Sequence, residues 1–586
     1  MLNTRIYRAG LVPALLALIV AAFSLQEPPR GVTTTLPPDA FNGARAFRVL
    51  NELATAHPDR RPGSLGDTQL ARRIQRVFTR RAYRLGVRSF TGETVDGKRD
   101  LLTIIGRRVG LSTRQIVVLA HRDALTRPAT AQLSGTAALL ELARVFEGRR
   151  QRRTITLVST SGGSGGNAGA MEFARATGGP IDAVIAVGDI AGARERRPFV
   201  VPWSDGLGIA PLSLRRTVEA AVRLEAGRSP GDARGLSQFA RLAFPATPGE
   251  QGVVLAQDVP AVLLQVSGER GPGSERAVSE DRLTAFGRAV LRSITALDAA
   301  PATITPPEAA VLLRGTILPL WAVRLLVAGL LLPALLAIVD GVARVARRRL
   351  GLGMWLAWAS ATAVPFALAV VFTWLLELTG LLPAAPPAPW PAGAIPLDTA
   401  AGAAMASVAL VALAAWLGVR PLILRIAGVR GAPGSGGSAA AVMLVLGAVA
   451  VAAWVFNPFA AAVLLLPVHL WLVVAAPEIR VRPVVAYLLV GVSLLPALLV
   501  GLAVAGALGV SGLEVPWTAL LFVAGGHIGP LTALGWSLVL GCLICVLAIA
   551  RAQDRRQADV PSPRTRGPAS YAGPGSLGGT DSGFHR

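Results

Sequence analysis

Long apolar runs recur along the second half of the chain. They lie near residues 316–339, 352–376, 397–419, 438–456, 459–476, 483–508 and 517–550. Each is long enough to cross a membrane, because a spanning helix needs about 20 apolar residues. The last run is about twice that length and is interrupted at Gly525-Gly526-His527-Ile528-Gly529-Pro530. It therefore predicts either one span or a half-helix followed by a full one.

A further apolar run, residues 11–25, follows a short start that carries Arg5 and Arg8. This pattern is typical of a signal sequence or of a short membrane anchor. We find no convincing cleavage site with small residues, so we interpret residues 1–29 as an uncleaved anchor. Together with the later runs, it gives eight predicted spans.

Basic residues occur in alternate loops between these runs. The loops 380–396, 457–458 and 509–516 contain no Lys or Arg, whereas the intervening ones are rich in Arg. The arginines of the basic loops and of the segment after the last run are Arg344, Arg347, Arg348, Arg349, Arg420, Arg425, Arg430, Arg480, Arg482, Arg551, Arg555 and Arg556. Lys and Arg in short loops stay on the cytoplasmic side. We therefore expect a multi-pass protein of the cell membrane with both termini cytoplasmic and residues 27–314 extracytoplasmic.

Between the anchor and the bundle, the pattern is that of a soluble domain. Apolar runs are short, and those at 101–106, 115–120, 154–159 and 181–187 are typical of buried strands, whereas 136–146 has helical periodicity. Strands that alternate with helices predict an α/β domain. We place this exported domain at residues 30–310, an all-α transmembrane bundle of about seven helices at 311–550, and a disordered, basic cytoplasmic tail at 551–586.

Composition narrows the possible classes of protein. The chain is 52% hydrophobic and 16% charged, which excludes an ordinary soluble protein and a mainly disordered one. The net charge of +23 is almost entirely due to Arg. Because the basic domain is exported, we interpret its Arg-rich stretches as solvated helix faces and expect no nucleic-acid partner. Membrane lipid is an expected partner, and a protein or peptide on the exported face is a possible one.

Polar residues follow three of the predicted strands where a site would form in an α/β sheet. They are His121-Arg122-Asp123, Ser161-Gly162-Gly163-Ser164 and Gly188-Asp189. His121 and Asp123 are open to two interpretations. They form part of a metal site, or they are a hydrogen-bonded pair that satisfies buried polar groups.

An ordered series of segments within residues 45–297 resembles the M28 family of zinc aminopeptidases and glutamate carboxypeptidases. The segments are Arg61-Pro62-Gly63-Ser64, His121-Arg122-Asp123, the stretch 134–141, Arg153-Thr154-Ile155 and Asp189-Ile190-Ala191-Gly192. The resemblance implies a mixed, mostly parallel sheet flanked by helices. It also implies two metal ions held by two His, two single carboxylates and a Glu, with a neighbouring Glu as general base.

The resemblance assigns only part of this centre to the chain. His121 matches the first ligand, Asp123 the carboxylate that orients it, and Asp189 a further ligand. Ala131 occupies the position expected for the bridging aspartate. Gly163 and Ser164 occupy the positions of the Glu-Glu pair, with Gly163 at the position of the general base. Gln251 is closest to the final His, and Glu250 becomes a ligand only if the alignment shifts by one residue.

These departures predict a pseudo-peptidase, because Ala and Gly neither bridge two cations nor take a proton from bound water. We therefore expect a non-catalytic binding or scaffold module with no cofactor, or with zinc if the site is retained. One alternative is an active zinc aminopeptidase with substituted ligands. Another is a transporter or lipid-handling bundle with the domain as its lid, for which Arg324 and His527 are the candidate polar groups in the membrane region. Arg324 could equally reach the membrane surface.

Overall fold

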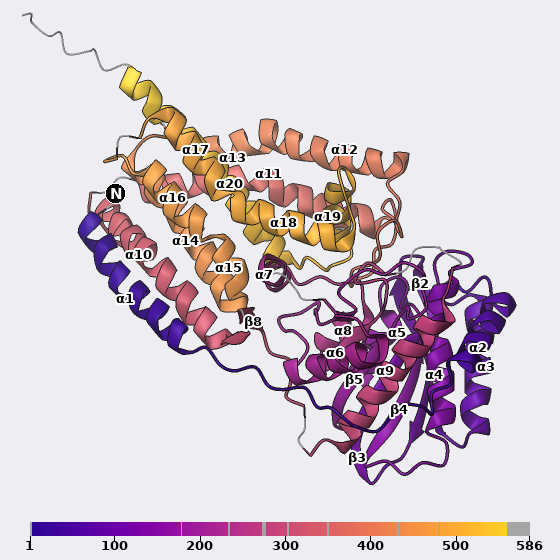
Figure 1. Ribbon diagram of the computed structural model, residues 1–586. Coiled ribbons are helices and arrows are strands. Elements are labelled where there is room, and N and C mark those ends of the chain that lie inside the picture. The colour runs from indigo at the N-terminus through magenta and orange to yellow at the C-terminus, as the bar shows by residue number, and fades with distance from the viewer. Residues whose placement is uncertain are drawn as a thin grey trace, which may run out of the picture.

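The computed structural model describes residues 3–176, 178–231, 235–271, 277–301, 304–313, 315–348, 351–429, 433–479 and 481–558, with side chains up to 554. The predicted disordered tail at 551–586 is wrong for residues 551–558, which continue the last helix, and the rest of it lies outside the described residues. Figure 1 shows an α/β domain at one end of the molecule and a bundle of long helices at the other.

Seven strands form one mixed sheet in the order β1-β2-β4-β3-β5-β7-β6. Strands β4, β3, β5 and β7 pair in parallel, whereas β1, β2 and β6 are attached by antiparallel pairing. The predicted mixed α/β fold and its four predicted strands are confirmed. The bounds are β1 (Arg84–Thr94), β2 (Gly97–Arg108), β3 (Ser112–His121), β4 (Arg153–Thr160), β5 (Ile181–Val187), β6 (Val200–Val201) and β7 (Ala261–Leu264).

The central strands are apolar along nearly their whole length because helices cover them. Residues 116–120 of β3 and 155–160 of β4 are buried. The predicted helix at 136–146 is confirmed as α4, which packs on β3 and β4, and α9 also contacts β3. The helices of the domain are α2 (Gly43–Ala56), α3 (Leu65–Arg80), η1 (Thr130–Leu133), α4 (Ser134–Val145), α5 (Ala168–Ala176), α6 (Leu212–Ala226), α7 (Gly235–Ala243), α8 (Glu250–Leu255) and α9 (Glu280–Ala299).

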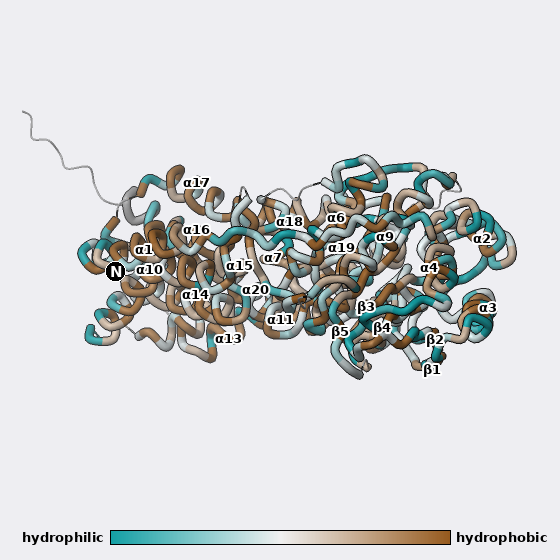
Figure 2. The backbone as a smooth tube through the Cα atoms, turned by 60° about the horizontal axis from the view of Figure 1, so that its bottom comes forward, coloured by the Kyte–Doolittle hydropathy of each residue, from teal (hydrophilic) through white to brown (hydrophobic). Residues whose placement is uncertain are grey.

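Eight helical segments in the described part of the chain are long and apolar enough to cross a membrane, as the sequence predicts. The interpretation of the last run as a half-helix followed by a full one is confirmed, since residues 525–529 separate a short helix from a long one. The first run differs, because Thr316–Pro319 pairs as strand β9 with β8 (Ala310–Leu313) and the helix begins only after Pro319. Figure 2 shows the apolar character of these helices beside the polar outer helices of the domain.

The eight segments are α1 (Thr4–Phe23), α10 (Leu320–Arg347), α11 (Leu352–Leu378), Thr399–Ile426, α14 (Gly436–Phe456), Pro458–Ala475, Pro483–Leu508 and Pro530–Asp554. Three of them consist of consecutive helices: Thr399–Ile426 contains α12 (Thr399–Ala414), η2 (Ala415–Val419) and α13 (Arg420–Ile426), Pro458–Ala475 contains α15 (Pro458–Val463) and α16 (Leu465–Ala475), and Pro483–Leu508 contains α17 (Pro483–Ser493) and α18 (Leu495–Leu508). The last segment is part of α20 (Pro530–Ala558). The short helix before α20 is α19 (Glu514–Ala524).

Helix α7 belongs to the α/β domain in sequence but lies against the bundle. It contacts α18 and α15, and Figure 1 shows it between the sheet and the membrane helices. The side-chain amide of Asn457, at the start of α15, donates to the carbonyl oxygens of Leu242 (2.9 Å) and Ala243 (3.3 Å) at the end of α7. The domain is therefore joined to the bundle by packing as well as by the chain.

Candidate functional site

His121 ends strand β3, and Glu250 begins helix α8. The Nδ1 atom of His121 lies 3.1 Å from Oε2 of Glu250, and the Thr160 hydroxyl at the end of β4 donates to Oε1 of Glu250 at 2.5 Å. Burial by itself lowers the pKa of His121, but the hydrogen bond and the charge of Glu250 outweigh it, so the pKa is raised. The structure thus brings together a His and a Glu that are 129 residues apart.

Asp123 holds the glycine-rich loop after β4. Its carboxylate accepts from the backbone N–H groups of Gly163 (3.1 Å) and Ser164 (3.0 Å) and from the Ser164 hydroxyl. The carboxylate beside the His121 ring is therefore Glu250, whereas that of Asp123 fixes the loop in which the resemblance expects a Glu-Glu pair.

Gly163 leaves no room for a side chain. A Cβ built at this position would lie 2.4 Å from Cβ of His121 and 3.0 Å from Cδ of Glu250. Contacts this short require the neighbours to move. The position matched to the general base is thus filled by the His121–Glu250 pair.

Asp189 follows β5 and closes a local turn. Its Oδ1 accepts from the backbone N–H groups of Ala191 (3.0 Å) and Gly192 (2.7 Å). The Ser134 hydroxyl lies 3.5 Å from the same oxygen. Burial raises the pKa of Asp189, and these hydrogen bonds partly offset the increase.

The two remaining positions that the resemblance singles out also have local roles. Ala131 is buried in η1, where its carbonyl oxygen accepts from the Ser134 hydroxyl at 2.6 Å. The amide of the buried Gln251 donates to the carbonyl oxygen of Trp203 (3.2 Å) and to the Thr247 hydroxyl (3.3 Å). Neither side chain supplies a carboxylate or an imidazole.

The candidate ligands take part in separate local contacts. Among the residues that the structure describes, no group of three or more His, Cys, Asp or Glu side chains is arranged to hold a metal ion. His121 and Glu250 bind each other, and Asp123 and Asp189 accept backbone N–H groups. A catalytic zinc site needs three protein ligands, and a co-catalytic one also needs a bridging carboxylate.

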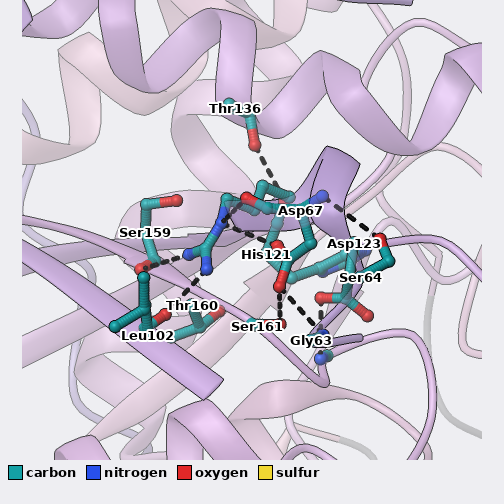
Figure 3. Close-up of polar contacts among 12 residues, drawn as sticks. Gly63, Ser64, Asp67, Leu102, His121, Asp123, Thr136, Ser159, Thr160 and Ser161 are labelled. Carbon is teal, nitrogen blue, oxygen red and sulfur yellow. Dashed lines mark hydrogen bonds and ion pairs between the residues drawn. The ribbon is translucent and has the colours of Figure 1, made fainter. Parts of the chain in front are cut away.

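A buried ion pair that the sequence pattern does not predict lies beneath the site. The Arg122 side chain is fully buried, and its Nε lies 2.8 Å from Oδ1 of Asp67 in α3. Oδ2 of Asp67 accepts from the Ser161 hydroxyl at 2.6 Å and from the Gly63 N–H at 3.1 Å (Figure 3). The only sequence signal was the position of Arg122 between His121 and Asp123, and nothing in the pattern pointed to Asp67.

A second buried charge cluster lies beside α8. Arg241, from α7, forms an ion pair with Glu269 at 2.5 Å. Asp205 accepts from the Thr247 N–H at 2.7 Å, and burial raises its pKa to about 8. These residues hold the connection between α7 and α8, and therefore the position of Glu250. The sequence pattern gave no reason to group them.

A cleft of about 300 Å³ opens over His121 and Glu250. One wall belongs to the α/β domain, and the other is the connection between α11 and α12. The cleft is lined by Arg61, His121, Leu125, Thr126, Gln132, Gly163, Ser164, Pro248, Gly249, Glu250, Leu263, Gln265, Glu269, Arg270, Gly271, Pro391, Ala392, Gly393 and Ala394.

The two candidate polar groups of the membrane region lie near the domain. Arg324 is an exposed residue in the first two turns of α10, and its carbonyl oxygen accepts from the indole N–H of Trp454 at 2.9 Å. His527 lies in the turn between α19 and α20. Its Nε2 is 3.0 Å from the carbonyl oxygen of Pro245, and its Nδ1 is 3.3 Å from that of Pro387.

The sequence matches no family model and no curated protein. Solved structures do match. A leucine aminopeptidase precursor from Bacteroides thetaiotaomicron is 15% identical with a TM-score of 0.38, and the match covers 45% of this chain and 99% of that one. A glutaminyl cyclase from the same organism, bound to N-acetylhistamine, is 15% identical with a TM-score of 0.37, covering 43% and 97%. A zinc aminopeptidase from Bacillus subtilis is 10% identical with a TM-score of 0.37, covering 45% and 97%.

Proposed function

We propose that the protein is an integral membrane protein whose peptidase-like α/β domain acts as a non-catalytic binding module. The observation that carries this proposal is the contact between Gly163 and His121. A Cβ at position 163 would lie 2.4 Å from Cβ of His121, so the space matched to a general base contains the His121–Glu250 pair.

The chemistry of the remaining groups supports the same conclusion. Metal-assisted peptide hydrolysis needs a base that takes a proton from bound water and a carboxylate that bridges the cations. Position 163 is Gly and position 131 is Ala. The cleft above His121 persists, so the site keeps a shape that can bind a ligand without the groups that would cleave one.

The proposed orientation places the α/β domain outside the cell. The loops on the domain side of the bundle, such as 380–396 and 509–516, contain no Lys or Arg. Arginines lie in the loops at the opposite ends, which favours a cytoplasmic location for those loops.

The test uses the full chain, purified in detergent and dialysed against zinc. We expect no stoichiometric zinc by mass spectrometry and no cleavage of aminoacyl-coumarin substrates above background. The His121→Ala variant is expected to match the parent in both measurements. About two retained zinc ions per chain, with chelator-sensitive cleavage that His121→Ala abolishes and the distant control Arg73→Gln preserves, would establish the active aminopeptidase instead.

A further inference from the structure

The cleft is bounded by a part of the membrane region. Residues 391–394, between spans α11 and α12, form the wall opposite His121 and Glu250. The same connection covers the glycine-rich loop, since a Cβ at Gly166 (φ +106°) would lie 2.5 Å from Cβ of Pro386. A ligand in the cleft therefore lies at the ends of the membrane helices.

Aromatic contacts fix the cleft in this position. The Phe244 ring, just after α7, stacks on Phe522 of α19 with centroids 6.2 Å apart and meets His527 edge-on at 5.9 Å. Trp390 packs on Phe522 at 5.3 Å. His527 in turn contacts the carbonyl oxygens of Pro245 in the domain and Pro387 in the connection. The two walls are thus held against each other.

Tryptophan residues place this region near the membrane surface. Trp321 is at the start of α10 and is 52% exposed, and the half-buried Trp454 is near the end of α14. Both are at the domain-side ends of these helices. Tryptophan is enriched at the level of lipid headgroups, so the cleft opens close to that level.

Most charged side chains of the cleft lining have an ion-pair partner. Glu250 is paired with His121, Glu269 with Arg241, and Arg61 with Asp96. Among the described residues, no carboxylate forms an ion pair with Arg270, the remaining cation in the lining. Within the described part of the chain, Arg270 is therefore the lining cation without a carboxylate partner.

Arg270 lies where the cleft meets a membrane helix. Its guanidinium donates to the carbonyl oxygen of Gly506, in the last turn of α18. A Cβ at Gly509 would lie 3.1 Å from Cδ of Arg270 and 3.5 Å from Cβ of Ala392. A guanidinium has five N–H donors in a geometry that suits phosphate oxygens.

We propose that the cleft binds the phosphate group of an anionic phospholipid from the leaflet on the domain side, with Arg270 as the anion contact. This inference rests on the proposed non-catalytic function and names its ligand class. The acyl chains stay in the bilayer beside the end of α18, while the headgroup enters between Arg270 and residues 391–394.

Native mass spectrometry of the full chain in neutral detergent tests the proposal. Phosphatidylglycerol and phosphatidylcholine with identical acyl chains are added in equal amounts, and the retained lipids are counted. We expect preferential retention of phosphatidylglycerol, and an affinity about tenfold weaker in Arg270→Gln, which removes one charge-assisted contact. Ala392→Trp, which fills the cleft at an exposed loop position, should weaken retention without removing a charge.

The matched control is Arg73→Gln in α3, a helix remote from the bundle, which removes a half-buried arginine paired with Glu52 and should leave the preference unchanged (Figure 1). Equal retention of the two lipids, or equal loss in Arg270→Gln and Arg73→Gln, would overturn the proposal. Full displacement of the lipid by inorganic phosphate would also overturn it, because the site would then bind a free anion. The zinc and cleavage assays are independent, so peptide cleavage with intact lipid retention would refute only the non-catalytic function.

Discussion

Gly163 and His121 lie so close that a Cβ at position 163 would be 2.4 Å from Cβ of His121. His121 ends strand β3, and Gly163 lies in the loop directly after β4, which pairs with β3 in parallel. Their contact explains why a small residue is required where the peptidase resemblance expects a Glu.

Gly163→Glu is therefore expected to destabilise the chain rather than restore a base. Overpacking a filled site costs about 1–3 kcal/mol, and a longer side chain must also displace Glu250. Thermal unfolding of the full chain in detergent measures the change. Gly178→Ala is the control, because no atom lies within 4 Å of a Cβ at that position. A variant as stable as the parent that also gains peptide cleavage would contradict the described packing.

The Arg122–Asp67 pair should be costly to break. Both side chains are buried, and removal of one partner leaves an uncompensated charge, which costs about 3–5 kcal/mol. We expect large losses of thermal stability in Asp67→Ala and Arg122→Met, and a smaller loss in the double variant than the sum of the two. Additive losses would show that the two charges do not depend on each other.

Asp205 should make stability depend on pH. Burial raises its pKa to about 8 in the folded chain, whereas the pKa of an Asp in the unfolded chain is about 3.9. Between these values the folded state retains a proton that the unfolded state has lost, so stability falls as pH rises, by at most about 1.4 kcal/mol per pH unit.

Asp205→Asn keeps an oxygen that can accept from the Thr247 N–H and removes the titration. Melting temperatures between pH 5 and 8, taken in one buffer series, should therefore fall less with pH in this variant than in the parent. The exposed-site variant Asp39→Asn should retain the parent slope. Parallel slopes in the parent and Asp205→Asn would mean that Asp205 does not carry a shifted pKa.

The α7 contacts should decide whether the domain stays docked on the bundle. Phe244→Ala removes the ring that packs on Phe522 and His527 and should cost roughly 2 kcal/mol, less than a fully buried Phe. Faster limited proteolysis within residues 244–249 of the full chain is the expected result. Leu224→Ala, at an exposed position of α6, is the control. Equal cleavage rates would show that this contact does not hold the domain.

The orientation is tested by cysteine labelling in intact cells. Both native cysteines are buried, so background labelling with an impermeant maleimide should be low. Lys98→Cys in the α/β domain should react from outside, and Ala346→Cys at the end of α10 only after permeabilisation. The opposite result would invert the proposed topology.

The order of elements was predictable from the sequence for a physical reason. A membrane-spanning helix needs about 20 consecutive apolar residues, and a buried parallel strand is apolar along its length. Both elements can therefore be recognised from a short stretch of sequence. The runs from 352 onward, the strands at 115–120 and 181–187 and the helix at 136–146 were identified in this way. The strand ends also placed His121 and Gly163 on one edge of the sheet.

Only the tertiary structure determined what these residues contact. The pairing of His121 with Glu250, the ion pair of Arg122 with Asp67, and the lack of space at Gly163 depend on side chains from distant segments. Helix α7 docks on the bundle, and residues 391–394 lie over the cleft, because the α/β domain and the helical bundle bury apolar surface against each other. The periodicity of apolar residues within one segment cannot predict such contacts, since they depend on how the domain and the bundle fit together.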